Sequence, residues 1–362
     1  MFAADKPACI INYKNLNLPQ HAKPVSIGKE INHDPEYRIQ FTPDNKVLIS
    51  FWERRPQTGL AIKDAPEKSG SVFVVLLLSR ETGELLKRIE WPVMGEVLPA
   101  QKIQYGSRIY PLHSGGYVGI INRHLQVFDP SFNVIHDKVL ETTKDVRYNL
   151  LVPLNGEFFS IELRGDDQIT MIIDSKTFKT IERFSGVNFI IGIWEDQLLA
   201  TSYSKDTREQ RFFKKKIGAS QWNDLGLIQG NRADAKFIYN GTIIVTDIIE
   251  QIPDRKVFWF MIENDKKSDP VFKGIGRFKP SWCVPIVAIR PNYLSDFRRA
   301  LDLDGKQWIE VYDLNAQRVL FTTKKYNDIV DYAISPNGDS IVLMTKKKIE
   351  FYKVPASSGT KK

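Results

Sequence analysis

A short hairpin pattern recurs along the 362 residues of this chain. In each copy, two β-rich strands flank a polar turn, a third strand ends at an acidic or polar residue, and a second turn leads into a fourth strand. The last copy, from Asp331 to Val354, is the clearest, because its turn from Ser335 to Asp339 combines Pro, Asn and Gly. Proline presets φ and Asn-Gly supplies left-handed backbone, so this segment predicts a tight hairpin turn. The first copy turns in a similar way at Thr42 to Asn45.

The copies follow one another at intervals of about 40–50 residues, which is the period of a four-stranded propeller blade. Seven copies are found, and they span residues 37–91, 103–140, 149–184, 188–228, 236–278, 284–323 and 331–354. The sixth copy is expected to turn at Arg290 to Asn292. Two unrelated β-sandwiches would explain the strands but not the regular interval. An eighth blade would need a copy within residues 15–35, which have the composition of a linker.

The two ends of the chain complement each other in this pattern. The last copy contains only three strands, and residues 8–13 form a short β-rich run before the first complete copy. An N-terminal strand that completes the C-terminal blade would close the ring and remove its exposed edges. We therefore expect an all-β fold, a single seven-bladed β-propeller of four-stranded antiparallel blades over residues 1–355. Residues 8–13 would close the ring, and residues 356–362 would form a flexible C-terminal tail.

Composition is consistent with a sizeable core, because 42% of the residues are hydrophobic and 26% are charged. The longest apolar run, residues 72–78, is far shorter than the roughly 20 residues of a membrane-spanning helix. Residues 1–5 look like the remnant of a cleaved signal peptide, which would place the protein in the periplasm or outside the cell; otherwise it is expected in the cytoplasm. Two cysteines, Cys9 and Cys283, are too few for a disulfide-dense scaffold or a four-cysteine zinc site. The sequence leaves open whether they pair.

Two segments of the last copy, Ala333 to Asp339 and Thr345 to Val354, resemble the WD-repeat-like and YVTN-type propellers of bacteria. Those families use a Ser-Pro-Asp/Asn-Gly turn and a later strand that ends in an Asp-containing turn. The resemblance implies a propeller fold and a broad range of functions. The Gly-His and Trp-Asp dipeptides of true WD repeats are missing, so their buried Asp-His-Ser-Trp network is expected to be missing as well.

Motifs of catalysis are absent from the sequence. There is no Gly-x-Ser-x-Gly elbow, no His-Glu-x-x-His pair and no phosphate-binding loop. The five histidines are scattered, and none pairs with another at a metal-ligand spacing. We therefore predict no catalytic residue, no metal site and no cofactor.

Basic residues recur in the segment between the second and third strands of every copy. In a propeller such equivalent loops lie on the same face. The chain has 51 Lys and Arg against 43 Asp and Glu, and we expect part of this positive charge to lie on that face. Acidic residues share several of these loops and offset part of the charge. Trp52 is expected to offer a stacking surface beside the first of the basic residues. The predicted cations are Arg54, Arg55, Arg123, Arg164, Arg208, Arg255, Lys306 and Lys347.

These observations favour a non-enzymatic binding or scaffold module, a monomer that holds a protein or another anionic macromolecule on its basic loop face. Nucleic acid ranks lower, because the net charge of +8 is modest for a chain of this length. The alternative is a propeller enzyme of the lactonase, glycan lyase or hydrolase type with its site at the central channel. The ends of the first strands are mostly apolar, with Arg38, Arg108, Arg147 and Asp331 as polar neighbours, and this scarcity of carboxylates ranks the enzyme second.

Overall fold

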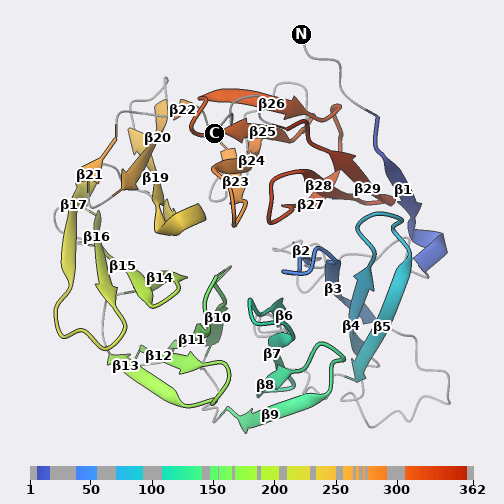
Figure 1. Ribbon diagram of the computed structural model, residues 1–362. Coiled ribbons are helices and arrows are strands. Elements are labelled where there is room, and N and C mark those ends of the chain that lie inside the picture. The colour runs from blue at the N-terminus through green and yellow to red at the C-terminus, as the bar shows by residue number, and fades with distance from the viewer. Residues whose placement is uncertain are drawn as a thin grey trace, which may run out of the picture.

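Seven antiparallel sheets stand side by side around an axis and form a closed ring (Figure 1). The predicted seven-bladed propeller is therefore confirmed. This computed structural model describes residues 6–16, 38–54, 71–92, 108–140, 147–153, 155–164, 168–185, 189–203, 210–228, 234–249, 256–263, 266–268, 272–273, 276–291 and 306–356. Over these ranges there is no α-helix, only the short 3-10 turns η1 (Tyr13–Leu16) and η3 (Tyr239–Gly241). None of these helical segments is long and apolar enough to cross a membrane.

Each blade is a meander whose first strand lies nearest the axis and whose fourth strand lies at the outside (Figure 1). Blade 1 contains β2 (Arg38–Phe41), β3 (Val47–Arg54), β4 (Ser71–Leu78) and β5 (Leu85–Pro92). Blade 2 contains β6 (Arg108–Pro111), β7 (Tyr117–Ile121), β8 (His124–Phe128) and β9 (Val134–Val139). Blade 3 contains β10 (Arg147–Leu151), β11 (Phe158–Arg164), β12 (Ile169–Asp174) and β13 (Thr180–Ser185).

The next three blades repeat this arrangement. Blade 4 contains β14 (Phe189–Trp194), β15 (Gln197–Tyr203), β16 (Gln210–Lys216) and β17 (Asn223–Ile228). Blade 5 contains β18 (Asp234–Phe237), β19 (Ile243–Ile249) and β20 (Lys256–Glu263), and two short pieces, β21 (Lys266–Lys267) and β22 (Phe272–Lys273), pair with β20 in place of one fourth strand. Blade 6 contains β23 (Gly276–Pro280), β24 (Ile286–Pro291), β25 (Glu310–Asp313) and β26 (Arg318–Thr322).

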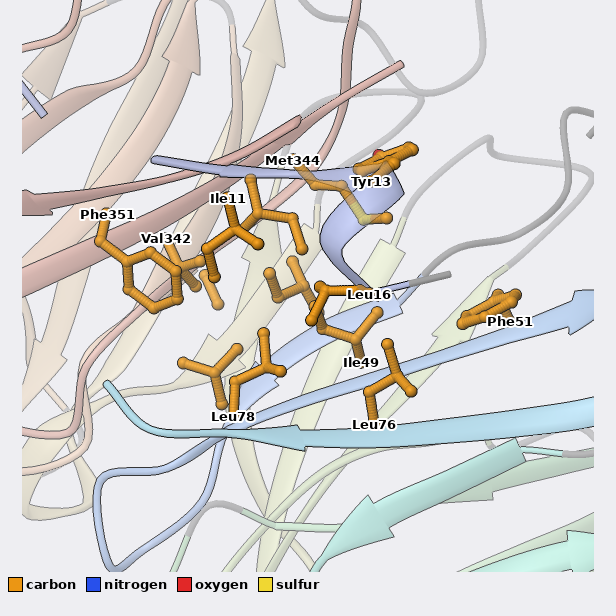
Figure 2. Close-up of a cluster of buried hydrophobic side chains, with 14 of the residues drawn as sticks. Ile11, Tyr13, Leu16, Ile49, Phe51, Leu76, Leu78, Val342, Met344 and Phe351 are labelled. Carbon is orange, nitrogen blue, oxygen red and sulfur yellow. The ribbon is translucent and has the colours of Figure 1, made fainter. Parts of the chain in front are cut away.

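Blade 7 is assembled from both ends of the described chain. It contains β27 (Ile329–Ile334), β28 (Ser340–Thr345) and β29 (Lys348–Lys353), and β1 (Cys9–Asn12) pairs antiparallel with β29 as its fourth strand. The side chains of Ile11, Tyr13 and Leu16 are 7%, 2% and 4% exposed. They pack on residues of blades 7 and 1, among them Val342, Met344, Phe351, Ile49, Leu76 and Leu78 (Figure 2). The predicted closing strand is therefore confirmed, and it joins the last blade to the first.

The first hairpin turns of the first and last blades are held by the same kind of hydrogen bond, in which a side-chain hydroxyl accepts from a backbone N–H. The side-chain oxygen of Thr42 accepts a hydrogen bond of 2.9 Å from the backbone N–H of Lys46. Ser335 does the same with the N–H of Ser340 at 3.0 Å, and its own hydroxyl donates to Asp339 at 2.6 Å. These bonds hold the two strands at a fixed register, which is why the Thr-Pro and Ser-Pro segments mark the turns in the sequence.

One predicted turn is wrong. Residues 290 and 291 end β24, the second strand of blade 6, rather than a first strand. The first hairpin of this blade turns instead between β23 and β24, where the N–H of Ser281 donates to Ile286 O at 2.9 Å. Blade 6 consequently begins at Gly276 and not near residue 284. The Arg-Pro-Asn segment contains residue types that are common in turns, whereas the true turn, Trp282 to Pro285, contains no Gly or Asn.

Neighbouring blades are joined at the outside by one repeated contact. The contact is made by the third residue of the outermost strand in four consecutive blades. It touches the turn between the third and fourth strands of the next blade, at the residue of that turn that has a positive φ. The second residue of the same strands, by contrast, is an apolar side chain that is exposed: Ile10, Leu86, Ile135 and Ile181. The contacting pairs are Ile11 with Gly83, Lys87 with Phe132, His136 with Phe178 and Glu182 with Gly218.

Blade 2 offers a test of its turn geometry at two adjacent glycines with positive φ. A Cβ on Gly116 would lie 2.3 Å from the carbonyl oxygen of Phe128, whereas a Cβ on Gly115 would meet nothing closer than Pro130 at 3.8 Å. Both substitutions strain the backbone by about 1 kcal/mol. We expect Gly116→Ala to lower the free energy of unfolding by about 3 kcal/mol or more, because it also forces a steric overlap. Urea denaturation of both variants measures this, and equal losses would contradict it.

Candidate binding face

The meander places the ends of all second strands and the starts of all third strands on one face of the ring, which we call the loop face. The first strands also begin at this face, because each is reached from the end of a fourth strand. Turns between first and second strands, and between third and fourth strands, lie on the opposite face. The loop face therefore combines these strand ends, beside which the basic residues are predicted, with the starting residues of the innermost strands.

Three blades show predicted cations on this face. Arg123 is exposed in a two-residue turn in which Asn122 and Arg123 have φ of 50° and 67°, as a tight hairpin requires. The amide of Asn122 donates to Pro92 O at 2.8 Å and fixes this turn against blade 1. Lys306 is exposed before β25, and Lys347 is exposed in the turn between β28 and β29 together with Lys346.

The other predicted binding residues are placed only by their backbone or not at all. Trp52 and Arg54 lie at the end of β3, opposite Phe73 and Ser71 of β4. Arg164 ends β11 and is paired directly with Arg147, the first residue of β10. Arg55, Arg208 and Arg255 lie outside the described residues.

The innermost strands add cations that the sequence analysis did not select. The first hairpin bond of each blade gives a common register, since Thr42, Ile238 and Ser281 each donate the N–H that opens the turn. Arg38 lies four residues before this point, near the loop face. Lys236 and Lys279 lie two residues before it, about 7 Å deeper along the axis. The charged residues on these seven strands are six basic (Arg38, Arg108, Arg147, Lys236, Arg277 and Lys279) and two acidic (Asp234 and Asp331).

The described inner cations reach from one blade to the next. The ammonium group of Lys236 lies 4.8 Å from the ring centre of Phe278 in blade 6. Lys279 lies 2.6 Å from Asp331 and 5.0 Å from the ring of Tyr332, both in blade 7. Asp331 in turn accepts a hydrogen bond of 3.0 Å from the N–H of Ile39 in blade 1.

Arg38 continues this series from blade 1 to blade 2. Its guanidinium carbon lies 5.7 Å from the ring centre of Tyr110, and one of its nitrogens donates to the Tyr110 hydroxyl. Aromatic rings orient a cation without cancelling its charge. The inner series therefore connects blades 5, 6, 7, 1 and 2 to one another.

A buried carboxylate joins blades 6 and 7 behind the loop face. Glu350 of β29 is 0% exposed. Its oxygens accept hydrogen bonds from Lys348 at 2.7 Å, Lys324 at 3.0 Å, Tyr352 at 3.1 Å, and Tyr326. Burial alone would raise the pKa of Glu350, but the bonds from Lys348, Tyr326 and Lys324 hold it below the usual range. Burial also raises the pKa of Tyr326, so its hydroxyl stays a donor. This network ties the connection that enters blade 7 to the strand that carries β1.

Over the described residues, no three His, Cys, Asp or Glu side chains come together in a way that would hold a metal ion. Both cysteines are free thiols. Cys9 lies in β1 of blade 7 and donates to Thr82 O at 3.4 Å, whereas Cys283 is exposed in the first turn of blade 6.

Comparison with known proteins supports the fold alone. No family model matches the chain, and no curated protein matches it by sequence. The WD40 domain of Neurospora crassa Pan2 superposes with a TM-score of 0.56 at 10% identity, over 99% of this chain and 98% of that one. The β-propeller domain of the Trilobed protease from Pyrococcus furiosus gives 0.57 at 10% identity, over 90% and 99%. An uncharacterized protein from Listeria monocytogenes gives 0.57 at 9% identity, over 91% and 97%.

These likenesses confirm a β-propeller with WD40-type neighbours; the YVTN type and the bacterial origin stay predictions. The Pyrococcus propeller is described as having an open velcro topology. In this chain, by contrast, β1 pairs with β29 and closes the last blade.

Proposed function

We propose that this chain is a non-enzymatic binding module that holds an acidic protein against its loop face. The observation that carries this proposal is that one face collects exposed basic turns and a basic set of innermost strands. Arg123, Lys306 and Lys347 are exposed on that face, and the innermost strands carry six basic residues against two acidic ones. An array of this kind attracts a partner of opposite charge and orients it during encounter.

The alternative predicted from the sequence is an enzyme with its site near the axis. Such a site would need groups that are available to act as acids, bases or ligands. Asp331, the inner carboxylate whose surroundings are described, is already engaged by Lys279 and by the N–H of Ile39. The contacts of the described residues therefore favour the binding module.

A labelled decaglutamate peptide tests the proposal by fluorescence anisotropy at low salt. We expect the double variant Arg123→Glu with Lys347→Glu to weaken binding about tenfold, since both changes place negative charge on the loop face. The matched control is Lys179→Glu with Lys353→Glu, because both of these lysines are exposed on the opposite face. The control is expected to bind like the unaltered protein, and added salt should weaken all binding. Equal effects of the two double variants, or tight binding of a decaglutamine peptide, would contradict the proposal.

A further inference from the structure

We infer that the acidic partner docks on a lysine patch in the sector of the loop face that blades 6 and 7 form. This inference rests on the proposed function, because it names the part of the face that the partner occupies. Its ligand is an extended segment of another protein with several Asp or Glu side chains. Four segments make up the patch, and together they contain seven lysines, no arginine and three acidic residues. These segments are residues 13–16, 306–310, 323–329 and 345–350.

All four segments lie at the loop face, since they follow β1, β26 and β28 or precede β25 in two neighbouring blades (Figure 1). Gln307 and Tyr326 exchange two backbone hydrogen bonds, of 2.6 and 2.7 Å, which place Lys306 beside the connection that enters blade 7. The backbone N–H of Lys346 donates to Asp328 of that same connection at 3.3 Å. The second, third and fourth segments are therefore held side by side.

The turn between β28 and β29 also contacts the segment that follows the closing strand. The N–H of Tyr13 donates to Lys347 O at 3.3 Å, and the Tyr13 hydroxyl donates to Thr345 O. Lys14 is the next residue along the chain and is exposed at the same end of blade 7. Direct hydrogen bonds thus bring the lysines of all four segments to one part of the surface.

Most of the positive charge in this patch is available to a ligand. Two of the lysines, Lys324 and Lys348, lie 3.0 and 2.7 Å from the same oxygen of the buried Glu350. One carboxylate compensates only one of these two cations, so the group keeps a net positive charge. Four other lysines are exposed and form no ion pair with a described residue, namely Lys14, Lys306, Lys346 and Lys347.

The uncharged side chains of the patch favour an acidic polypeptide as its partner. Trp308 is half-buried, with the ammonium group of Lys325 5.2 Å from its ring centre and its indole N–H donating to Glu310 at 2.7 Å. The four segments therefore lack the exposed rings on which the bases of single-stranded nucleic acid stack. Ammonium groups are point charges that donate in several directions, so they accept carboxylates at irregular spacing. The remaining aromatic and aliphatic residues of the patch are buried: Tyr13, Leu16, Ile309, Tyr326, Ile329 and Ile349.

The test measures binding of labelled decaglutamate at low salt to two double variants that remove the same charge from different parts of the loop face. Lys346→Gln with Lys347→Gln alters the patch, and we expect an affinity loss of about tenfold. Arg123→Gln with Lys138→Gln alters blade 2, where both residues are exposed, and the expected loss is at most about twofold.

A second patch variant guards against a local folding defect. Lys14→Gln with Lys306→Gln changes two other segments of the patch and is also expected to weaken binding about tenfold. The melting temperature of each variant, measured beforehand, shows whether it is folded. Loss of affinity in both patch variants, with the blade 2 variant nearly unaffected, supports the inference.

The other outcomes separate this inference from the proposed function. Equal losses for the patch and blade 2 variants would overturn the patch and leave binding on the loop face intact. No loss in any of them, together with none for Arg123→Glu with Lys347→Glu, would overturn both. If a decathymidine oligonucleotide or vesicles that contain phosphatidylserine bind more tightly than decaglutamate, the assignment to an acidic polypeptide is wrong.

Discussion

Removal of residues 1–16 is expected to lower the melting temperature by roughly 10 °C or more, because the deletion opens the ring at blade 7. The lost strand pairs with β29 along its whole length, and the N–H of Ala8 adds a further bond to Phe351 O at 2.7 Å. Ile11, Tyr13 and Leu16 each bury a large apolar side chain, which is worth about 1.5–3 kcal/mol apiece. Deletion of residues 357–362 is the control and should leave the melting temperature unchanged. Equal melting of both truncated proteins would refute closure by the N-terminal strand.

A pair of neighbouring substitutions tests the same closure without a deletion. Ile11 is 7% exposed and packs between blades 7 and 1, whereas Ile10, the residue before it, is 48% exposed. We expect Ile11→Ala to lower the free energy of unfolding by about 2–4 kcal/mol and Ile10→Ala by less than about 0.5 kcal/mol. Urea denaturation at pH 7 measures both. The two variants have the same composition, so a difference between them reports burial at this junction.

Replacement of Glu350 by alanine is expected to have the second large effect, a loss of about 3–5 kcal/mol. The substitution would leave the hydroxyls of Tyr326 and Tyr352 and the ammonium groups of Lys324 and Lys348 without the acceptor they now share. Glu157→Gln is the control, because Glu157 forms an ion pair with Lys176 at the surface, where such pairs contribute about 0–1 kcal/mol. A loss for Glu350→Ala as small as that of the control would show that the network does not hold blades 6 and 7 together.

The Glu350 carboxylate also makes the stability of the folded protein depend on pH. The pKa of Glu350 is lower in the folded chain than the usual value of about 4.3 in an unfolded one. Its contribution is therefore complete above about pH 4.3 and is lost as the pH falls through the lower, folded-state value. In Glu350→Gln this part of the acid dependence should disappear. Urea denaturation between pH 7 and pH 3 checks the sign: the stability difference between the unaltered protein and the variant should shrink as the pH falls.

Much of this architecture follows from turn chemistry that can be seen in the sequence. Ser335 and Thr42 begin segments rich in Pro, Asn or Gly, and their hydroxyls hold the turns that those segments predict. The sixth blade shows the limit of such signals. There the turn at Trp282 to Pro285 is fixed by a contact with the neighbouring blade, since the N–H groups of Trp282 and Cys283 donate to Pro336 O at 3.1 and 3.0 Å. A turn that depends on another blade cannot be predicted from the local sequence.

Only part of the candidate site could be predicted, because some of its residues also depend on contacts with other parts of the chain. The basic turns follow from counting strands, because each copy repeats the same order. The positions of the Lys236 and Lys279 side chains, in contrast, depend on the register of short first strands. A shift of one residue in that register turns a side chain to the other side of the strand. Glu350 lies in the segment from Lys346 to Lys353, which has the composition of a solvated strand. Its burial depends on Lys324 and Tyr326, which come from the preceding connection.

The closure of blade 7 also sets an order of events during synthesis. Tyr13 donates its hydroxyl to the carbonyl of Thr345, a partner 332 residues further along the chain. At about 5–20 residues per second, the ribosome needs roughly 15 to 70 s to produce that partner after Tyr13 has been made. Throughout this interval the first strand lacks its partner strand, and its hydrogen-bonding groups are bound to water instead. If two chains exchanged these strands, the product would be a strand-swapped dimer with two complete rings.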